Sequence, residues 1–437
     1  MGKASQVVLL VLSVFVYVSG LLFSSNLQRR TGMGDMRSRV VAARLVNEGR
    51  SPYFYNWYPG DDMRYFDGWY VDSIKPNKPV PANMTSSPVL IHVLQPFAEA
   101  NEWDVERGFF LFYQASFLLV MVLVVWCAPR SHKLYSLLPL VPFVWTDGWL
   151  YHTLMAQLYM LLAFVFALAC MAIVRQKQVL AGILLLVLTL LRPNGIVMCL
   201  PFMLCWPQWR SLLFTYLSCG AGYVIFCLLN SFEKTLWQDF FASLKLHQAR
   251  QMIPNQSPIY GNWYVHDMMP RPFEGADYIA IDAALEARPF EINTENTNVK
   301  DVYRAFAHKY PPACLLQALF GASVVVVMWV AHKVNKLRSL APHQLAITGM
   351  LLFFLSNFFS TVTSNAYQWP QWYAVAAVYG MAMDKIQKRA LVFFAAGLVV
   401  NQYFFPDFRG KHIVAEMLLL ASCVLTLVLP PKSKINE

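Results

Sequence analysis

The stretch that decides the fold is VLAGILLLVLTLL-RPNG-IVMCLPFMLCW, residues 179–206, in which two apolar runs flank Arg192-Pro193-Asn194-Gly195. Each run is shorter than the roughly 20 apolar residues that a membrane-spanning helix needs. The number of helices in this stretch decides on which side of a membrane every later loop lies: counting one helix instead of two moves each of those loops to the other side. We interpret the stretch as two helices broken at Arg192-Pro193-Asn194-Gly195, because this count places the Lys- and Arg-rich short loops on one side of the membrane.

The composition is that of a polytopic membrane protein. Of the 437 residues, 57% are hydrophobic and only 14% are charged, against about 45–50% and about 25% in a soluble domain. The net charge of +10 could indicate nucleic acid binding, but most of the excess lies in short loops between apolar runs, so we predict no nucleic acid partner. The eight cysteines all lie in or beside apolar runs, which indicates neither a disulfide framework nor a zinc or iron–sulfur site.

Apolar runs predict an all-α bundle of about twelve transmembrane helices. The first run is interpreted as a retained helix, since no A-x-A-like cleavage site follows it. The candidate spans are 6–24, 108–128, 134–145, 153–174, 179–191, 195–206, 212–230, 312–330, 345–362, 372–383, 391–405 and 413–429.

The positions of Lys and Arg predict the orientation of these spans. With the N-terminus in the cytoplasm, the cytoplasmic loops are rich in cations and the short exterior turns are poor in them, as the positive-inside rule requires. This orientation makes residues 1–437 a single integral membrane domain with both termini cytoplasmic, as in a bacterial inner membrane. Two long polar segments, residues 25–107 and 231–311, then form exterior loops with interfacial helices.

An amphipathic helix is predicted in the first exterior loop, directly after Asp35. Val40, Val41, Leu45 and Val46 recur at helical spacing, and we expect this apolar stripe to face lipid in the interface plane. Asp35 stands at or next to the start of this helix. It is either an N-cap or a catalytic carboxylate held at the membrane surface.

Short motifs spread over most of the chain resemble a known family. They are Asp35 with its interfacial helix, Gly49-Arg-Ser-Pro52-Tyr53, Ser87-Pro88 before an apolar helix, Ala156-Gln157-Leu-Tyr-Met-Leu-Leu, Leu191-Arg192-Pro193 and Asn255-Gln256-Ser257. In this order they resemble the GT-C glycosyltransferases, most closely the polyprenyl-phosphate-sugar-dependent mannosyltransferases of the GT87 type. Ala156 stands where that pattern has glycine, and Arg192 stands where it has lysine.

The resemblance implies transfer of a sugar from a polyprenyl-phosphate donor to an acceptor hydroxyl of a glycan, lipid or protein, at the exterior face. It implies that Asp35 is the general base. Arg192 ends an apolar helix on the exterior side, so it is the leading candidate for binding the lipid phosphate; the alternative is an arginine that snorkels to lipid headgroups. No cofactor is required by the sequence, although a second acid could bind Mg²⁺ or Mn²⁺ together with Asp35.

Further candidates fall into two sets. His152, Gln157, His247 and Arg250 are predicted to contact the donor phosphate; His152 and Gln157, about one turn apart on one predicted helix, could instead join helices to each other. Tyr53, Tyr55, Trp57, Asp147 and Gln256 are predicted to bind the acceptor or the sugar. The three aromatic residues could equally form the core of a folded loop, and Asp147 could form a turn.

Two rival functions remain open from the sequence. A transporter or flippase of lipid-linked saccharides would share the basic loops, the aromatic residues and a phosphate-binding arginine, but it should need more polar residues at mid-membrane depth. An O-antigen polymerase or ligase would also keep a large exterior loop.

Overall fold

The computed structural model describes residues 3–31, 36–58, 60–66, 80–81, 84–129, 133–154, 157–251, 298–307, 309–362, 366–408 and 410–431. Helices dominate these residues. The first part of the chain forms α1 (Lys3–Thr31), α2 (Met36–Asn47), η1 (Met63–Tyr65), α3 (Pro88–Leu94), η2 (Gln95–Phe97) and α4 (Glu102–Cys127). The only strands among the described residues are two short ones, β1 (Asn56–Trp57) and β2 (Val80–Pro81), which pair antiparallel.

The rest of the chain forms the body of the bundle. It contains η4 (Tyr135–Leu137), η5 (Val141–Trp145), α5 (Asp147–Leu154), α6 (Tyr159–Val174), α7 (Gln178–Leu191), η6 (Pro193–Cys199), α8 (Leu200–Met203), α9 (Trp206–Leu229), α10 (Ser231–Gln251), α12 (Val299–Ala307), α13 (Ala313–Arg338), α14 (Pro342–Phe358), η8 (Ala366–Trp372), α15 (Tyr373–Met381), α16 (Lys388–Val400) and α17 (Lys411–Val428). The predicted all-α class is therefore confirmed.

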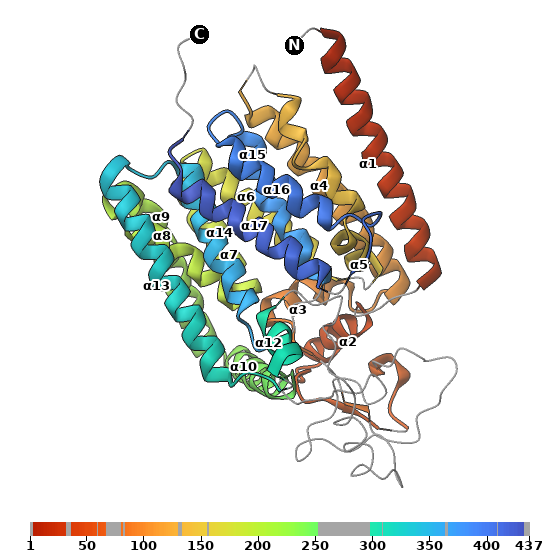
Figure 1. Ribbon diagram of the computed structural model, residues 1–437. Coiled ribbons are helices and arrows are strands. Elements are labelled where there is room, and N and C mark those ends of the chain that lie inside the picture. Colours follow the sequence, from red (N-terminus) through yellow and green to blue (C-terminus); the bar gives the residue numbers. More distant parts are fainter. Residues whose placement is uncertain are drawn as a thin grey trace.

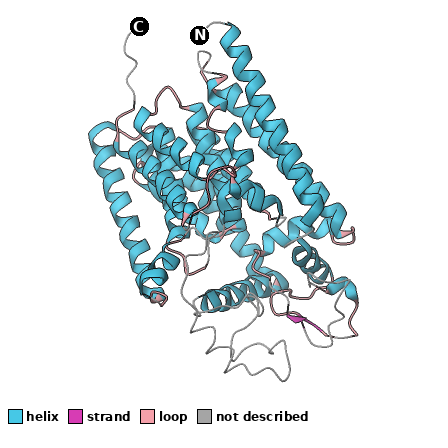
Figure 2. Cartoon of the chain, turned by 45° about the vertical axis from the view of Figure 1, so that its right-hand side comes forward, coloured by secondary structure: helices cyan, strands magenta, loops and turns pink. Residues whose placement is uncertain are grey.

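The bundle has a clear polarity (Figure 1). α1 begins and α17 ends at the same end of the bundle, whereas α2, α3, α10 and α12 all lie at the other end. The cartoon shows helices of this second end running across the bundle rather than along it (Figure 2).

Five helices in the described part of the chain are long and apolar enough to cross a membrane. They are Gln6–Asn26, Asp104–Cys127, Trp206–Leu229, Ala313–Arg338 and Lys411–Val428. Large apolar side chains such as Phe15, Phe214 and Val325 are exposed on them, as expected of surfaces that face lipid rather than water. The protein is thus an integral membrane protein.

The break at Arg192 is confirmed. α7 ends at Leu191, Arg192 is extended with φ −145° and ψ 101°, and a 3₁₀ helix begins at Pro193. Pro193 cannot donate the backbone hydrogen bond that would continue the α-helix. The second apolar run is less regular than predicted, because η6 and the one-turn α8 replace a single helix.

The predicted span 134–145 is not an α-helix. It folds as two 3₁₀ helices, η4 and η5, because Pro139 and Pro142 each remove a backbone donor from the helical ladder. The segment is still buried in the bundle, where the main chain of Val16 in α1 accepts a hydrogen bond from Trp145 Nε1 at 3.2 Å.

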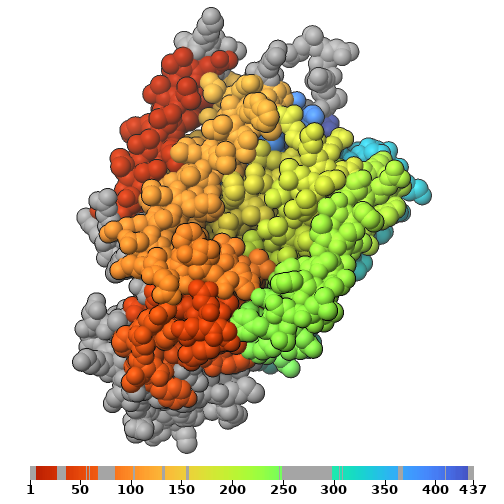
Figure 3. Space-filling view, turned by 180° about the vertical axis from the view of Figure 1, so that it is seen from behind, coloured from red at the N-terminus to blue at the C-terminus, as the bar shows by residue number. Residues whose placement is uncertain are grey.

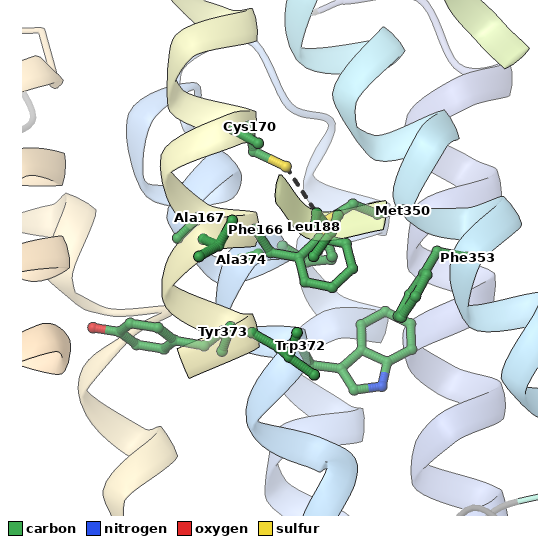
Figure 4. Packing of buried hydrophobic residues seen from close by; sticks show 14 of the residues in the cluster. Phe166, Ala167, Cys170, Leu188, Met350, Phe353, Trp372, Tyr373 and Ala374 are labelled. Carbon is green, nitrogen blue, oxygen red and sulfur yellow. Dashed lines mark hydrogen bonds between the residues drawn. The ribbon is translucent and has the colours of Figure 1, made fainter. Parts of the chain in front are cut away.

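The core of the bundle is a mixture of aromatic rings and small residues. α6, α14 and α15 meet there, with Phe166 and Phe353 rings 4.6 Å apart between their centroids. Figure 4 shows Trp372 and Tyr373 pointing to opposite sides of this core. Tyr373 donates to the carbonyl oxygen of Phe117 in α4 at 2.9 Å, so neighbouring residues of η8 and α15 connect two parts of the bundle.

The helix after Asp35 exists as predicted, but its apolar stripe does not face lipid. α2 is buried on nearly all sides from Val40 to Val46. Val41 and Leu45 pack in a small second core with Tyr55, Trp57, Tyr65 and Phe66, while Val40 and Val46 belong to the main core. Amphipathic spacing reveals only that one face avoids water, and here protein rather than lipid covers that face.

Arg44 fixes α2 to the loops around it. Its Nε donates to Ala98 O at 2.7 Å, and its Nη1 donates to Arg64 O at 2.7 Å. A cation is buried here because several backbone carbonyls accept its hydrogen bonds.

Candidate functional site

A half-buried arginine, Arg192, lies where α7 ends. The extended backbone at Arg192 directs its guanidinium toward the end of α14 and toward η8. Its Nη2 donates to Asn357 Oδ1 at 3.0 Å and to Gln368 Oε1 at 3.1 Å. The break in α7 therefore positions a cation among residues that are more than 160 positions away in the sequence.

Two aromatic rings also contact this guanidinium. Its Cζ lies 5.3 Å from the ring centroid of Tyr159 and 5.6 Å from that of Phe353, distances at which cation–π attraction operates. The second terminal nitrogen, Nη1, is buried and has no hydrogen-bond partner within the residues that the structure describes. Arg192 thus keeps a free donor.

Asn194 extends the same polar cluster. Its Nδ2 donates to Ser356 Oγ at 2.8 Å and to Asn357 Oδ1 at 3.0 Å. Asn357 accepts from both Arg192 and Asn194, so one amide oxygen joins the two sides of the break. The two amide oxygens that accept hydrogen bonds from Arg192 are neutral, and no carboxylate in the described part of the chain pairs with it. We call Arg192, Asn194, Asn357 and Gln368 the arginine cluster.

A small pocket adjoins the arginine cluster. It lies between the end of α14, η8 and the start of α17, and has room for about one water molecule. Its lining residues are Phe354, Asn357, Gln368, Trp369, Gln371, Trp372 and Glu416. Asn357 and Gln368 belong to both sites, so the pocket and the cation share a wall.

A second polar cluster joins α2 to the start of α6. Arg39 Nη2 donates to Gln157 Oε1 at 2.6 Å, and the backbone N–H of Gln157 donates to His152 O at 3.2 Å. The His152 ring lies 4.8 Å from the Tyr113 ring, centroid to centroid. Burial, and next the Arg39 guanidinium, lower the pKa of His152 to about 3, so this imidazole is neutral at physiological pH.

His152 and Gln157 do not lie on one helix, contrary to the prediction. α5 ends at Leu154 and α6 begins at Tyr159. The imidazole Nε2 of His152 accepts the backbone N–H of Met160 at 3.1 Å, which caps the first turn of α6. The two residues nevertheless lie in the same cluster, because the backbone N–H of Gln157 donates to the carbonyl oxygen of His152.

Asp147 is held in a buried ion pair. Its Oδ2 lies 2.6 Å from Lys411 Nζ, which also donates to the carbonyl oxygens of Gln402 and Phe405. Burial raises the pKa of Asp147, and the hydrogen bond from Lys411 opposes that shift. The pair ties the start of α5 to the start of α17, so the predicted acceptor contact by Asp147 gains no support from its geometry.

The three predicted sugar-binding rings are covered by protein. Tyr53 packs against Phe240 of α10 and donates to Ser86 O at 2.8 Å. Tyr55 contacts Tyr65, and Trp57 contacts Phe66 in the second core. The burial of these rings supports the alternative that they form the core of a folded loop.

The structure describes the remaining predicted site residues only in part. Asp35 and Gln256 lie outside the described residues. Arg250 is in the last turn of α10, but its side chain is outside the description. His247 is half-buried on the same helix. Figure 3 shows the first loop, coloured red-orange, against the green α10, and His92 Nε2 and Glu233 Oε1 meet across this boundary at 2.8 Å.

Among the described residues, no group of three or more His, Cys, Asp or Glu side chains is arranged to bind a metal ion. The predicted pairing of Asp35 with a second acid around Mg²⁺ or Mn²⁺ is untested, because Asp35 lies outside this description.

Comparison with known proteins gives one match. The family model of glycosyltransferase family 87 matches residues 87–357, more than half of the chain. The chain belongs to glycosyltransferase family 87. The resemblance drawn from the motifs is confirmed, and this family 87 protein is a membrane glycosyltransferase. No curated protein and no solved structure matches it.

The family 87 match covers the arginine cluster only in part. Arg192, Asn194 and Asn357 lie inside residues 87–357, whereas Gln368 and the pocket residues of η8 and α17 lie beyond it. Sequence reasoning singled out Arg192 but missed Asn357, Gln368 and Gln371. Asn357 lies in the predicted span 345–362, and Gln368 and Gln371 lie between that span and the next, so an amide in or near an apolar run was their only signal.

Proposed function

We propose that this protein transfers a sugar from a polyprenyl-phosphate donor to an acceptor hydroxyl of a glycan, lipid or protein, at the exterior face of the membrane. The observation that carries the proposal is the half-buried cation of Arg192, whose Nη2 donates to two neutral amides and whose buried Nη1 has no hydrogen-bond partner among the described residues. A buried donor nitrogen without a partner is costly unless an acceptor binds to it. A lipid phosphate is an anionic acceptor that the free Nη1 can bind.

The proposed chemistry is one displacement at the anomeric carbon. The acceptor oxygen forms a bond to the anomeric carbon, while the bond from this carbon to the phosphate oxygen breaks. The lipid phosphate leaves with the electron pair, and Arg192 stabilises its negative charge. The acceptor hydroxyl gives its proton to Asp35, the general base.

Asp35 itself lies outside the described residues. The next residue, Met36, is fully buried at the start of α2, and one turn later Arg39 Nη2 donates to Gln157 Oε1. We infer that Gln157 and His152 support the donor side.

We further propose that the chain crosses the membrane twelve times, with both termini in the cytoplasm. In this orientation the donor enters from the outer leaflet between helices. α2, α3, α10 and α12, which share one end of the bundle (Figure 1), then lie at the exterior face. His247, Arg250 and Gln256 belong to the second exterior segment, and we retain them as candidate contacts to phosphate and acceptor.

The decisive experiment replaces the proposed base. Asp35→Asn should abolish transfer of radiolabelled sugar from polyprenyl-phosphate sugars while leaving donor affinity within about twofold, because the amide keeps the shape but takes no proton. Asp104→Asn is the matched control, since Asp104 is an exposed acid near the start of α4; it should retain full activity.

The flippase alternative gives the opposite result. It predicts movement of the lipid-linked sugar across a vesicle membrane that survives Asp35→Asn, with no transfer by the wild type. That outcome would contradict the transferase proposal.

A further inference from the structure

One amide oxygen near the end of α14 holds both sides of the break after α7. Asn357 Oδ1 accepts a hydrogen bond from Arg192 Nη2 at 3.0 Å and another from Asn194 Nδ2 at 3.0 Å. An amide oxygen has two lone pairs, and both are used here. Because each of these partners is a donor, the oxygen and not the amide nitrogen of Asn357 must face the break. The buried Asn357 side chain is therefore fixed in one orientation.

The hydrogen bonds continue from Asn194 to the backbone of α14. Asn194 Nδ2 also donates to Ser356 Oγ at 2.8 Å, and Ser356 Oγ donates to Phe353 O at 2.6 Å. The ring of Phe353 lies 5.6 Å from Arg192 Cζ, measured to the ring centroid. The last turns of α14 thus contact the guanidinium through a ring and through an amide. These contacts hold the guanidinium in place, while its Nη1 has no hydrogen-bond partner among the described residues.

Both acceptors of Arg192 Nη2 are amides rather than carboxylates. Asn357 and Gln368 are buried, and each accepts through its side-chain oxygen. A carboxylate at either position would accept the same hydrogen bond and would also neutralise the arginine in an ion pair. An amide accepts the hydrogen bond without a negative charge. The guanidinium therefore keeps its positive charge, and a phosphate that binds there meets no competing anion from these two side chains.

We propose that Asn357 and Gln368 are positioning residues for the lipid phosphate of the donor. They orient the Arg192 guanidinium so that Nη1 is the nitrogen left for a phosphate oxygen, and their neutrality leaves the charge of Arg192 to that phosphate. The inference rests on the proposed function, and it adds that two uncharged acceptors set the affinity of the site for phosphate.

The test adds one negative charge to the arginine cluster without changing its shape. In the purified protein, the affinities of polyprenyl phosphate and of uncharged polyprenol are measured. Asn357→Asp should weaken binding of polyprenyl phosphate about tenfold, because the new carboxylate pairs with Arg192 and repels the phosphate. It should leave the affinity of polyprenol and the melting temperature unchanged, since aspartate has the same size and accepts the same two hydrogen bonds.

Gln368→Glu is a second variant with the same expected result. It adds the charge from η8 instead of α14, so it tests the neutrality of the cluster independently of the fold of the α14 end. Its glutamate oxygen can still accept the hydrogen bond from Arg192 Nη2.

Asn335→Asp is the matched control. Asn335 is a half-buried asparagine in the last turn of α13, and its Oδ1 also accepts two hydrogen bonds, from Leu340 N at 3.0 Å and from Cys205 Sγ at 3.3 Å. The substitution adds the same charge at the opposite end of the bundle from Arg192, beyond the range of unscreened attraction. The affinity of polyprenyl phosphate should therefore stay within about twofold of the wild type.

Two results would overturn the inference. One is an unchanged affinity for polyprenyl phosphate in both Asn357→Asp and Gln368→Glu. The other is an equal loss for polyprenol and polyprenyl phosphate, which would mean a structural role. If Asn357→Asp weakens binding of polyprenyl phosphate but the wild type transfers no sugar, the proposed function is contradicted and the positioning role stands. A wild type that binds polyprenyl phosphate no more tightly than polyprenol would contradict both.

Discussion

At the scale of single residues, Arg192 is the side chain on which the proposed chemistry depends. Its planar guanidinium contacts Asn357 and Gln368 through Nη2 and keeps Nη1 free. Lysine has one compact ammonium group and cannot reproduce this fork. The arginine where the family pattern has lysine therefore has a structural reason in this chain, because it must bind both protein amides and the ligand.

Removing this cation should weaken donor binding. Arg192→Ala is expected to lower the affinity for polyprenyl phosphate by about 1.5–3 kcal/mol, roughly 10- to 150-fold, because hydrogen bonds to charged groups are lost. Binding of the radiolabelled lipid measures this directly.

The control is Arg338→Ala. Arg338 is another partly buried arginine, whose Nη2 donates to the carbonyl oxygens of Leu427, Val428 and Leu429 at the opposite end of the bundle. Its loss should affect stability alone. Unchanged donor affinity in Arg192→Ala would remove Arg192 from the phosphate site.

His152 should make the stability depend on pH. Its pKa is about 3 in the folded protein and 6.5 when unperturbed, with burial as the main cause. The unfolded chain therefore binds the extra proton between these values, so stability is complete above pH 6.5 and falls as the pH drops toward 3, by up to about 1.4 kcal/mol per pH unit.

Replacing the imidazole should remove this contribution. His152→Gln keeps a side-chain acceptor for Met160 but does not titrate. The difference in melting temperature between pH 8 and pH 5 should be smaller in this variant than in the wild type. Equal differences would show that His152 is not the titrating group.

At the scale of elements, close helix contacts depend on small residues. A Cβ atom on Gly182 of α7 would lie 2.6 Å from the carbonyl oxygen of Leu212 in α9, closer than real atoms approach. Gly182→Ala should push the two helices apart and lower the free energy of unfolding by about 1–3 kcal/mol.

Gly222 provides the comparison within α9. A Cβ atom there meets nothing within 4 Å, so Gly222→Ala should keep or raise the stability through its higher helix propensity. Thermal unfolding of both variants tests the contact. Equal melting temperatures for the two would contradict it.

Several elements were predictable from the sequence and several were not. Apolar length predicts α1, α4, α9, α13 and α17, because a helix is the only way for a single apolar segment to satisfy its backbone in lipid. The same criterion fails for residues 134–145, which form η4 and η5, because Pro139 and Pro142 each remove a backbone hydrogen-bond donor from an otherwise apolar run. The break between α5 and α6 was also missed, since His152 caps α6 with a ring nitrogen and no standard cap residue marks the helix start.

At the scale of the whole molecule, the testable property is orientation. We expect the end with α2, α3 and α10 to be exterior and the end with the α13 C-terminus to be cytoplasmic. In a variant with the eight cysteines replaced, a new cysteine at Asp61 should react with a membrane-impermeant thiol reagent in intact cells. One at Lys336, in the last turn of α13, should react only after permeabilisation.

If Lys336→Cys reacted with the reagent in intact cells and Asp61→Cys did not, the orientation would be the opposite of the one proposed. Labelling of both positions from one side would contradict the crossing pattern itself.

The sequence alone determined the class of the protein, its five long apolar helices and the break at Arg192, because these follow from the local cost of placing polar groups and prolines in apolar runs. It also indicated the family, because the short motifs occur along the chain in the family's order. Only the tertiary structure decided which side chains bind Arg192, since Asn357 and Gln368 lie more than 160 residues away from it. It also decided that α2 is covered by protein, because periodicity shows which face avoids water and not what covers that face.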